Sequence, residues 1–299
     1  MVCRFVIHPY LHNMLLKGFV FLMLAITSLL SAEAQNNTVQ TDEKPFILGK
    51  SVRIYSRNLN ENRVLNIYFP EGYTDKDTIR YPVIYLLDGG ADEDFIHIVG
   101  LVQFNTFPWI ARMPRSIVVG IANVDRKRDF TYPTTLLEDK QRYPGSGHSD
   151  HFISFLKNEL QPFIAKNYKT NNFKTIIGES LGGLLATEIV LKQPDLFDQY
   201  IIISPSLWWD NGSLLNINPV LPSNRTKVYI GVGKEGVWPG KVPHVGEVDA
   251  NLLADKLINL HSKEMQVSFD YLPQENHATI LHQAVFNAFR LLYPVKQTE

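Results

Sequence analysis

A glycine-flanked serine between a strand-like and a helix-like segment is the most constraining feature of this chain. The apolar, β-branched run at 175–177 leads into the pentad Gly-Glu-Ser-Leu-Gly at 178–182, and a helix-like stretch follows from Leu181 to Lys192. A strand, a sharp turn and a helix in this order are typical of a turn that exposes a nucleophilic serine. We expect both glycines to be required, because a Cβ at either position would clash with its neighbours. The pattern therefore predicts Ser180 as a nucleophile, with the Leu181 N–H directed at a developing oxyanion.

Length and composition are those of an ordinary globular enzyme. The chain has 299 residues, of which 45% are hydrophobic and 20% are charged, so one large α/β domain with a sizeable core is expected. The formal net charge is −1, which gives no indication of a nucleic-acid partner or an acidic polymer substrate.

The N-terminus has the features of a signal peptide. An apolar run at 19–30 follows Lys17, and Ala-Glu-Ala at 32–34 is a small-x-small cleavage site. We therefore expect a signal peptide over residues 1–34, a polar linker over 35–48 and a catalytic domain over 49–299. The apolar run is too short to span a bilayer comfortably, so no stable membrane insertion is expected after cleavage. An uncleaved anchor is the alternative.

Two further features of the N-terminal segment bear on the mature protein. Residues 1–13 are polar for a signal peptide, so either Met1 or Met14 is the true start of the precursor. The only cysteine, Cys3, lies in the segment expected to be removed, so the mature chain would contain no disulfide and no thiolate. A cysteine-free exported enzyme of this size is typical of a bacterial periplasm, and secretion is the other possibility.

Apolar runs and helical periodicity alternate along the chain. An opening hairpin followed by buried strands and helices predicts one doubly wound, mostly parallel sheet. Two connections are long enough to shape a substrate pocket, 123–147 and 208–223. The expected hairpin strands are 51–55 and 63–69, the buried strands are 82–87, 116–121, 201–203, 227–232 and 265–272, and the helices are 149–167, 181–192, 248–261 and 277–292.

His277 is the best candidate for the general base. In hydrolases with this turn, the acid and then the histidine follow the nucleophile along the chain. His277 follows the expected strand at 265–272 and a short turn, which places it at the carboxyl edge of the sheet. His282 lies in the expected helix that follows and should point elsewhere.

The acid of the triad is less constrained. It should follow the strand at 227–232, and Glu235 is the first carboxylate after that strand. Its task would be to hold the imidazole tautomer and stabilise the imidazolium. Glu247 and Asp249 are alternatives, and a site that works with a Ser–His pair alone is a third.

The loop after the strand at 82–87 is expected to supply a second oxyanion donor. This loop reads Asp-Gly-Gly at 88–90, and the Gly90 N–H is the candidate beside the Leu181 N–H. His148 and His151 have a spacing that metal ligands use, but they lie at an expected helix start, so no metal or cofactor is predicted.

Several segments accompany the serine pentad and resemble a known family. They are 81–89, 118–123, 126–131, 203–209 and Asn276-His277. Together they resemble the putative-esterase branch of the α/β-hydrolases, which includes esterase D, feruloyl and acetylxylan esterases, mycobacterial mycolyltransferases and catecholate-siderophore esterases. The similarity is greatest to the siderophore-esterase-like group of exported bacterial hydrolases and covers about residues 49–292. It implies an α/β-hydrolase fold.

The resemblance also implies site residues. Ser180 would be the nucleophile, His277 the base, and the N–H groups of Leu181 and Gly90 the oxyanion hole, whereas the family's acid position is irregular. The family's cationic contact to an aromatic or acidic substrate would fall near two arginines, for which solvated loop charges are the alternative. Two tryptophans could stack on a sugar or aryl group or simply form a buried wall. These residues are Arg126 and Arg128, and Trp208 and Trp209.

These observations predict an exported serine esterase that acts through an acyl-enzyme on Ser180. Its expected partner is a small-molecule or glycan ester, and the candidates are siderophore esters, feruloyl or acetyl esters of polysaccharides, and simple acyl esters. An acyltransferase of the same fold and a non-catalytic binding protein remain as alternatives.

Overall fold

The computed structural model describes residues 13–14, 17–23, 41–76, 78–238 and 242–294. The chain divides into two compact units, Met1–Phe46 and Ile47–Glu299. The expected cleavage site at 32–34 and the start of the expected linker lie outside the described residues. In the part of the chain that is described, no helix combines the length and the apolar character that crossing a membrane requires.

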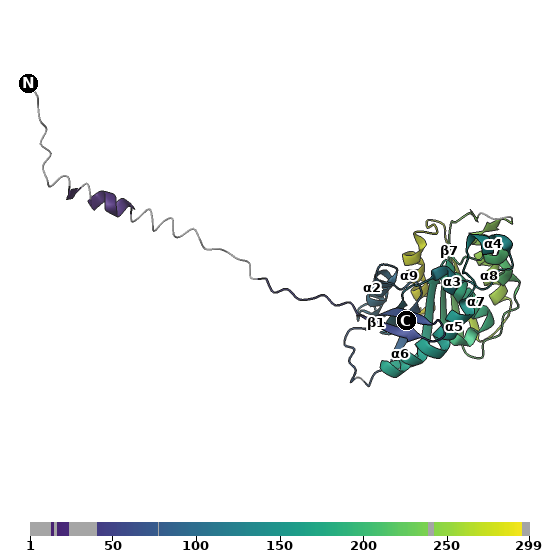
Figure 1. Ribbon diagram of the computed structural model, residues 1–299. Coiled ribbons are helices and arrows are strands. Elements are labelled where there is room, and N and C mark those ends of the chain that lie inside the picture. The colour runs from purple at the N-terminus through teal and green to yellow at the C-terminus, as the bar shows by residue number, and fades with distance from the viewer. Residues whose placement is uncertain (1–12, 15–16, 24–40, 77, 239–241, 295–299) are drawn as a thin grey trace, which may run out of the picture. The chain divides into compact units, whose positions relative to one another are not determined.

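An eight-stranded sheet organises the second unit (Figure 1), in the order β1-β2-β4-β3-β5-β6-β7-β10. β1 pairs antiparallel with β2 and β2 antiparallel with β4, whereas all other neighbours are parallel. The prediction of a mostly parallel sheet opened by a hairpin is therefore confirmed. The strands are β1 (Lys50–Ser56), β2 (Glu61–Tyr68), β3 (Tyr81–Leu86), β4 (Ile117–Ile121), β5 (Thr170–Glu179), β6 (Gln199–Ile203), β7 (Thr226–Gly233) and β10 (Met265–Leu272).

Helices cover both faces of this sheet, which explains why its strands are continuous apolar runs. In β3, Val83 and Tyr85 pack in one hydrophobic cluster, and Ile84 and Leu86 pack in the other, because successive side chains point to opposite faces. α2 (Phe95–Thr106) and α9 (Ile280–Leu292) contribute to the second cluster (Figure 1). The opposite face is covered by α3 (Arg126–Phe130), α5 (Ser149–Phe155), α6 (Gln161–Asn167), α7 (Leu181–Lys192) and α8 (Gly246–Ile258).

Some boundaries differ from the predicted ones. The helix expected at 149–167 consists of α5, a π-helical turn at Leu156–Leu160 and α6, and α9 begins at Ile280 rather than at His277. The two long connections contain α3, α4 (Leu137–Arg142) and a 3₁₀ segment at Trp209–Asn216. Helices this short are marginal in isolation, so tertiary contacts rather than local periodicity determine them.

The carboxyl edge of the parallel strands carries unusual backbone conformations. Asp88 after β3, Ser180 after β5 and Ser204 after β6 have φ values of 52°, 57° and 42°. A non-glycine residue in this region costs about 1–3 kcal/mol and persists only where its surroundings hold it. The edge that receives the candidate residues is therefore also the edge where strain is concentrated.

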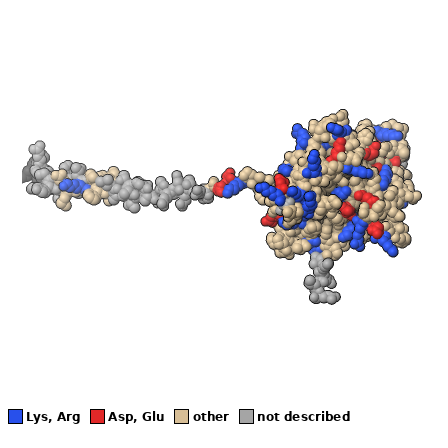
Figure 2. Space-filling view, turned by 90° about the horizontal axis from the view of Figure 1, so that it is seen from below, with Lys and Arg blue, Asp and Glu red and all other residues tan. Residues whose placement is uncertain are grey.

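Surface charge is mixed in sign. On the face shown in Figure 2, Lys and Arg side chains are interspersed with Asp and Glu, in keeping with the net charge of −1. Ligand recognition is therefore expected to depend on particular side chains rather than on an extended surface potential of one sign.

Candidate active site

The Ser180 backbone is held in its strained conformation from both neighbouring segments. Its N–H donates to the Ile203 carbonyl oxygen at 3.0 Å. Its carbonyl oxygen accepts from the N–H groups of Leu184 at 2.9 Å and Ser206 at 3.0 Å. These bonds tie the turn to β6 and to the first turn of α7, and they maintain a φ of 57° that a free serine would rarely adopt.

The glycines around this serine are required to different degrees. A Cβ at Gly178 would lie 2.4 Å from the Gly182 carbonyl oxygen, so the expected clash there is confirmed. At Gly182 the nearest atom would be a side-chain oxygen of Asp88 at 3.2 Å, which needs only a small shift. The clash expected at both flanking glycines is therefore severe at Gly178 and slight at Gly182, whereas α7 packs closely against β6 at the next residue. There, a Cβ at Gly183 would lie 2.8 Å from the Ile203 carbonyl oxygen.

Ser180, His277 and Glu235 form one hydrogen-bonded chain. The His277 Nε2 lies 3.1 Å from the Ser180 Oγ, and its Nδ1 lies 3.1 Å from the Glu235 Oε2. The three residues follow β5, β10 and β7, which lie close together in the sheet order. Because the carboxyl ends of parallel strands meet at one edge, residues distant in sequence converge there. With its proton on Nδ1, the imidazole can accept the proton of the serine hydroxyl.

The other carboxylates and the other histidine are engaged elsewhere. Glu247 accepts the Gly236 N–H at 3.0 Å, and Asp249 pairs with the His244 ring at 2.7 Å. The His282 ring packs edge-on against the His97 ring, 4.8 Å between centroids. The Glu235 side chain is only 2% exposed, so its carboxylate is sheltered from water where it meets the imidazole.

The two expected oxyanion donors differ in their surroundings. Leu181 begins α7, where the first N–H groups have no partner within the helix. The Gly90 N–H instead donates to the Glu93 Oε2 at 2.6 Å, and the Glu93 Oε1 accepts from the Asn123 side chain at 2.8 Å. Gly90 can therefore serve an oxyanion only when the Glu93 carboxylate turns away, and its role stays a prediction.

A cavity of about 240 Å³ opens at this site, which we name the catalytic pocket. The Trp238 ring stands edge-on to the His277 ring, 4.9 Å between centroids, and stacks on the Trp208 ring at 6.0 Å. Sequence reasoning missed Trp238, although its position three residues after Glu235 was a usable signal. The lining residues are Arg126, Lys127, Thr131, Tyr143, Ser180, Leu181, Ser206, Trp208, Trp209, Trp238 and His277.

Of the two arginines expected near the substrate, Arg126 lines the pocket and Arg128 does not. Arg126 is bound to the Asp88 carboxylate at 2.6 and 3.0 Å and to the Glu179 carbonyl oxygen at 3.2 Å. Arg128 donates two hydrogen bonds to Glu61, at 3.0 and 2.6 Å. It belongs to an ion-pair network that also contains the buried Arg63 and Asp129, which explains why its charge is absent from the pocket.

The two expected tryptophans both line the pocket but differ in burial. Trp209 is 1% exposed, and its indole N–H donates to the Tyr132 carbonyl oxygen at 2.9 Å. Trp208 is half-buried and presents its ring beside Trp238. Trp209 is thus a structural wall, whereas Trp208 is the ring available to a ligand.

A cluster of carboxylates lies near Ser180. Burial raises the pKa of Glu179 to about 7, and the charge of Asp94 adds to this effect while that of His277 opposes it. Burial also raises the pKa of Asp94 to about 6, with a further contribution from the Asp88 charge. Arg126 faces both carboxyl groups and opposes these shifts, and His97 does so at Asp94. Because both pKa values are raised, ionisation of Glu179 and Asp94 near neutral pH destabilises the folded state.

We expect Glu179→Gln to stabilise the protein above pH 7 and not below pH 5. Between the ordinary pKa near 4.5 and the raised value of about 7, the folded state binds more protons than the unfolded state, so the free energy of unfolding falls as pH rises. The glutamine amide does not ionise, so the variant does not lose this part of the free energy of unfolding as pH rises. The Tm of the variant should exceed that of the parent at pH 8 by a few degrees, since 1 kcal/mol shifts Tm by about 2–4 °C in a domain of this size.

Thermal unfolding followed by circular dichroism at pH 5 and pH 8 measures this difference. Glu264→Gln is the matched control, because Glu264 is exposed and its removal should shift Tm equally at both pH values. A Glu179→Gln difference that does not change with pH would contradict the prediction.

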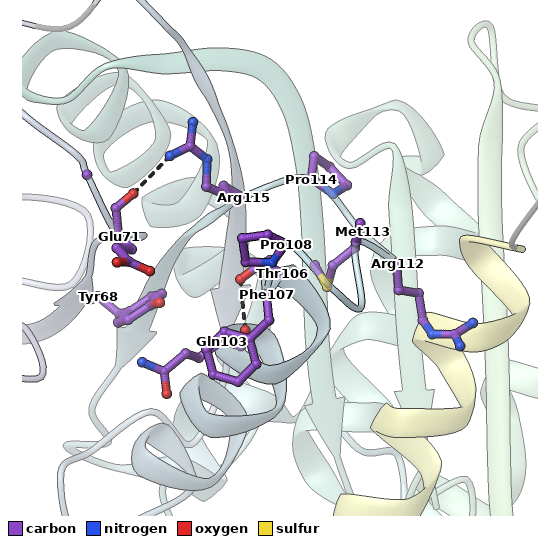
Figure 3. Close-up of a pocket in the computed structure, with 12 residues that line it drawn as sticks. Tyr68, Glu71, Gln103, Thr106, Phe107, Pro108, Arg112, Met113, Pro114 and Arg115 are labelled. Atoms are coloured by element: carbon purple, nitrogen blue, oxygen red, sulfur yellow. Dashed lines mark hydrogen bonds between the residues drawn. The ribbon is translucent and has the colours of Figure 1, made fainter.

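A larger cavity, of about 730 Å³, lies at the opposite edge of the sheet (Figure 3). Met113 and Arg115 line it just before β4 begins, and Tyr68 lines it at the end of β2. Figure 3 shows Arg115 donating to the Glu71 carbonyl oxygen, at 3.0 Å. Its lining residues contain no serine and no histidine, so its size alone does not make it the reaction site.

No cluster of three or more His, Cys, Asp or Glu side chains suited to a metal ion occurs among the residues that the structure describes. His148 and His151 contact each other through their rings, 5.8 Å between centroids, at the start of α5.

A sharp serine turn after β5, a carboxylate after β7 and a histidine after the last strand match the order typical of the α/β-hydrolase class. The model of the esterase family, described as "Putative esterase", matches residues 56–244. The chain belongs to this family and is a carboxylic ester hydrolase.

Similar proteins agree with this assignment. Over 277 residues the chain is 29% identical to the ferri-bacillibactin esterase BesA of Bacillus subtilis, covering 83% of this chain and 91% of that protein. Over 183 residues it is 27% identical to the siderophore triacetylfusarinine C esterase of Aspergillus fumigatus, covering 58% and 61%. An IroE-like serine hydrolase from Shewanella oneidensis superposes with a TM-score of 0.71 at 30% identity, over 82% of this chain and 80% of that one. The expectation of an esterase is confirmed.

Proposed function

We propose that this protein is a serine esterase that cleaves ester bonds of a siderophore through an acyl-enzyme on Ser180. The observation that carries the proposal is the unbroken chain from the Ser180 Oγ through the His277 ring to the Glu235 carboxylate, with both contacts at 3.1 Å. A hydroxyl, an imidazole and a carboxylate in this order are the groups that acyl transfer needs.

In the proposed reaction, the His277 Nε2 removes the Ser180 proton as the Oγ attacks the ester carbonyl carbon. The negative charge on the carbonyl oxygen is stabilised by the Leu181 N–H at the start of α7, and by the Gly90 N–H once Glu93 releases it. The imidazolium then protonates the departing alcohol. Water, activated by the same imidazole, attacks the acyl-enzyme and releases the acid, and Ser180 recovers its proton.

The substrate class comes from the relatives. The similarity to the ferri-bacillibactin esterase extends over most of both chains, which supports a siderophore ester over a feruloyl or acetyl ester. The catalytic pocket is consistent with aryl groups, because the Trp208 and Trp238 rings border it.

Export is also part of the proposal. The apolar run at 19–30 and the Ala-Glu-Ala sequence at 32–34 support a signal peptide that directs the enzyme to the periplasm or the medium. The first strand of the sheet begins at Lys50, so the segment expected to be removed contributes no strand to that sheet.

Active-site labelling tests the nucleophile. A fluorophosphonate should modify one serine, in the peptide that contains Ser180, and p-nitrophenyl acetate should give a rapid release of about one nitrophenolate per chain before steady turnover. Ferri-bacillibactin should be hydrolysed with a higher kcat/KM than a feruloylated sugar. Absence of both labelling and turnover would indicate a non-catalytic binding protein, and transfer of the acyl group to an added alcohol in place of water would indicate an acyltransferase.

A further inference from the structure

The outer surface of α2 and α9 is almost free of formal charge. The two helices lie side by side on one face of the sheet (Figure 1), where ring contacts join His97 to His282 and Phe104 to Phe286. α2 contains no Lys, Arg, Asp or Glu, and α9 contains only Arg290. A helix at the surface of a protein normally turns charged and polar residues outward, as α8 does. The surface of α2 and α9 therefore differs from an ordinary solvated one.

Large apolar side chains project from this surface. Ile96, Phe104 and Leu291 are 54%, 43% and 45% exposed, and Trp109, just after α2, is 75% exposed. The Trp109 ring stacks on the Phe107 ring, 4.6 Å between centroids and 19° between planes. These side chains form one surface that we name the α2 patch, made of Ile96, Gly100, Phe104, Phe107, Trp109, Phe286 and Leu291.

The exposed area of the α2 patch is that of a protein interface. At about 150–250 Å² for a whole aromatic side chain and about 100 Å² for a leucine or isoleucine, the patch leaves roughly 400 Å² of apolar surface in water. A standard interface buries about 800 Å² on each partner, and somewhat more than half of that area is apolar. The patch can therefore supply the apolar part of one side of such an interface.

Gly100 forms a notch at the centre of the α2 patch. A Cβ at this position would meet no described atom within 4 Å, so packing within the chain does not require a glycine. A glycine in a helix interior is nevertheless less stable than an alanine. Ile96 and Phe104 lie one turn away on either side, so the notch allows another helix to approach the α2 backbone closely.

The two ends of α2 carry opposite charges. Asp92 is exposed before the helix and Arg112 is half-buried after it, and neither has an ion pair with a described residue. Figure 3 shows that the Arg112 guanidinium points away from Glu71 and Arg115. Two antiparallel copies of α2 would therefore place Asp92 of one copy beside Arg112 of the other.

The α2 patch is also suited to meet a copy of itself. A two-fold axis brings the same patch from both subunits together, and a patch without charge does so without like-charge repulsion. With the axis at Gly100, the Phe107 and Trp109 rings of one copy would lie against Ile96 of the other. The apolar residues, the notch and the terminal charges are thus all compatible with one arrangement.

We propose that the α2 patch is the interface through which two copies of this chain form a dimer, with α2 packed antiparallel on α2 across Gly100. No residue of the patch lines the catalytic pocket, so the inference does not depend on the proposed function.

Sedimentation equilibrium of the purified protein tests the dimer. The average mass should approach twice that of the chain at about 50 µM and fall towards that of a single chain near about 0.1 µM, as a micromolar Kd implies. Phe104→Glu should raise this Kd at least about 100-fold, because the dimer would bury two unpaired carboxylates. Leu252→Glu is the matched control, since Leu252 is 49% exposed on α8, and it should change the Kd less than twofold.

Two further variants separate association from folding. Gly100→Gln should raise the Tm of the dilute monomer, because glutamine is the better helix former, and should raise the dimer Kd about tenfold by filling the notch. Asp92→Arg should raise the Kd about fivefold through repulsion of Arg112 across the interface, and adding Arg112→Asp should restore it.

Three results would overturn the inference. They are a single-chain mass at every concentration, a dimer that Phe104→Glu leaves unchanged, and a monomer that binds phosphatidylglycerol vesicles through Trp109, which would make the patch a membrane-contacting surface. Turnover of p-nitrophenyl acetate reports on the proposed function separately and should stay within twofold of the parent in all of these variants.

Discussion

Replacing Ser180 with alanine should lower kcat for p-nitrophenyl acetate by roughly 10⁴- to 10⁶-fold, as loss of a nucleophile does in other serine hydrolases. Without the Oγ there is no atom for the ester carbon to bond to, and the His277 Nε2, 3.1 Å away, has no hydroxyl proton to accept. Steady-state hydrolysis, with the uncatalysed rate subtracted, measures the effect. His277→Ala should produce a loss of similar size.

The same substitution should leave the fold intact. Alanine keeps the Cβ of serine, so it adds no strain at a φ of 57°, and the Oγ contacts only His277 and Ser206 among the described side chains. Ser206→Ala is the matched control, because it removes the hydroxyl 3.3 Å from the Ser180 Oγ and leaves the imidazole in place. We expect less than a tenfold loss there. Turnover of Ser180→Ala within tenfold of the parent would exclude Ser180 as the nucleophile.

Replacing Glu235 with glutamine should lower kcat by roughly 10³- to 10⁴-fold, as amides in place of triad carboxylates do. A glutamine amide can donate to the His277 Nδ1, which favours the tautomer with its proton on Nε2. That tautomer cannot accept the Ser180 proton. The loss of the carboxylate also removes the negative charge that stabilises the imidazolium, at a position where the side chain is only 2% exposed.

Two control variants decide whether this effect is specific. Glu247→Gln and Asp249→Asn alter the other carboxylates of the region, which contact the Gly236 N–H and His244. Both should retain activity within about threefold of the parent, since neither Glu247 nor Asp249 contacts the His277 imidazole. If Glu235→Gln were fully active and one of these variants were not, the acid would be the other residue. Three fully active variants would indicate a Ser–His pair.

The order of residues along the chain was sufficient to predict the sheet, and it also led to Ser180 and His277 as candidate site residues, whose roles stay predictions. The pentad at 178–182, the apolar strand runs and the late histidine each obey local rules: turn sterics, burial on two faces and placement after a strand. Glu235 was predicted only as the first carboxylate after a strand, with two competitors. Its contact with His277 depends on β7 and β10 being neighbours, which no local rule determines.

Which charged side chains line the pocket, and which are paired elsewhere, was harder to predict than where residues lie in the sheet. Arg126 and Arg128 look equivalent in the sequence, yet one lines the pocket while the other is held by Glu61 and Asp129. Which cation is neutralised depends on carboxylates brought from distant segments, such as Asp88 after β3 and Glu61 in β2. That Lys127, in the pocket lining, has no ion pair with any described residue could be recognised only after these pairings were known.

By itself, the sequence determined that this chain forms a doubly wound sheet with a serine in a sharp turn at one edge, because backbone sterics and the spacing of apolar residues act over a few neighbouring positions. Only the tertiary structure decided which carboxylate meets His277, which N–H groups remain available and that Trp238 stacks on Trp208 in the pocket lining. Those outcomes depend on contacts between segments far apart in the chain, where small differences in packing select one partner among several chemically similar ones.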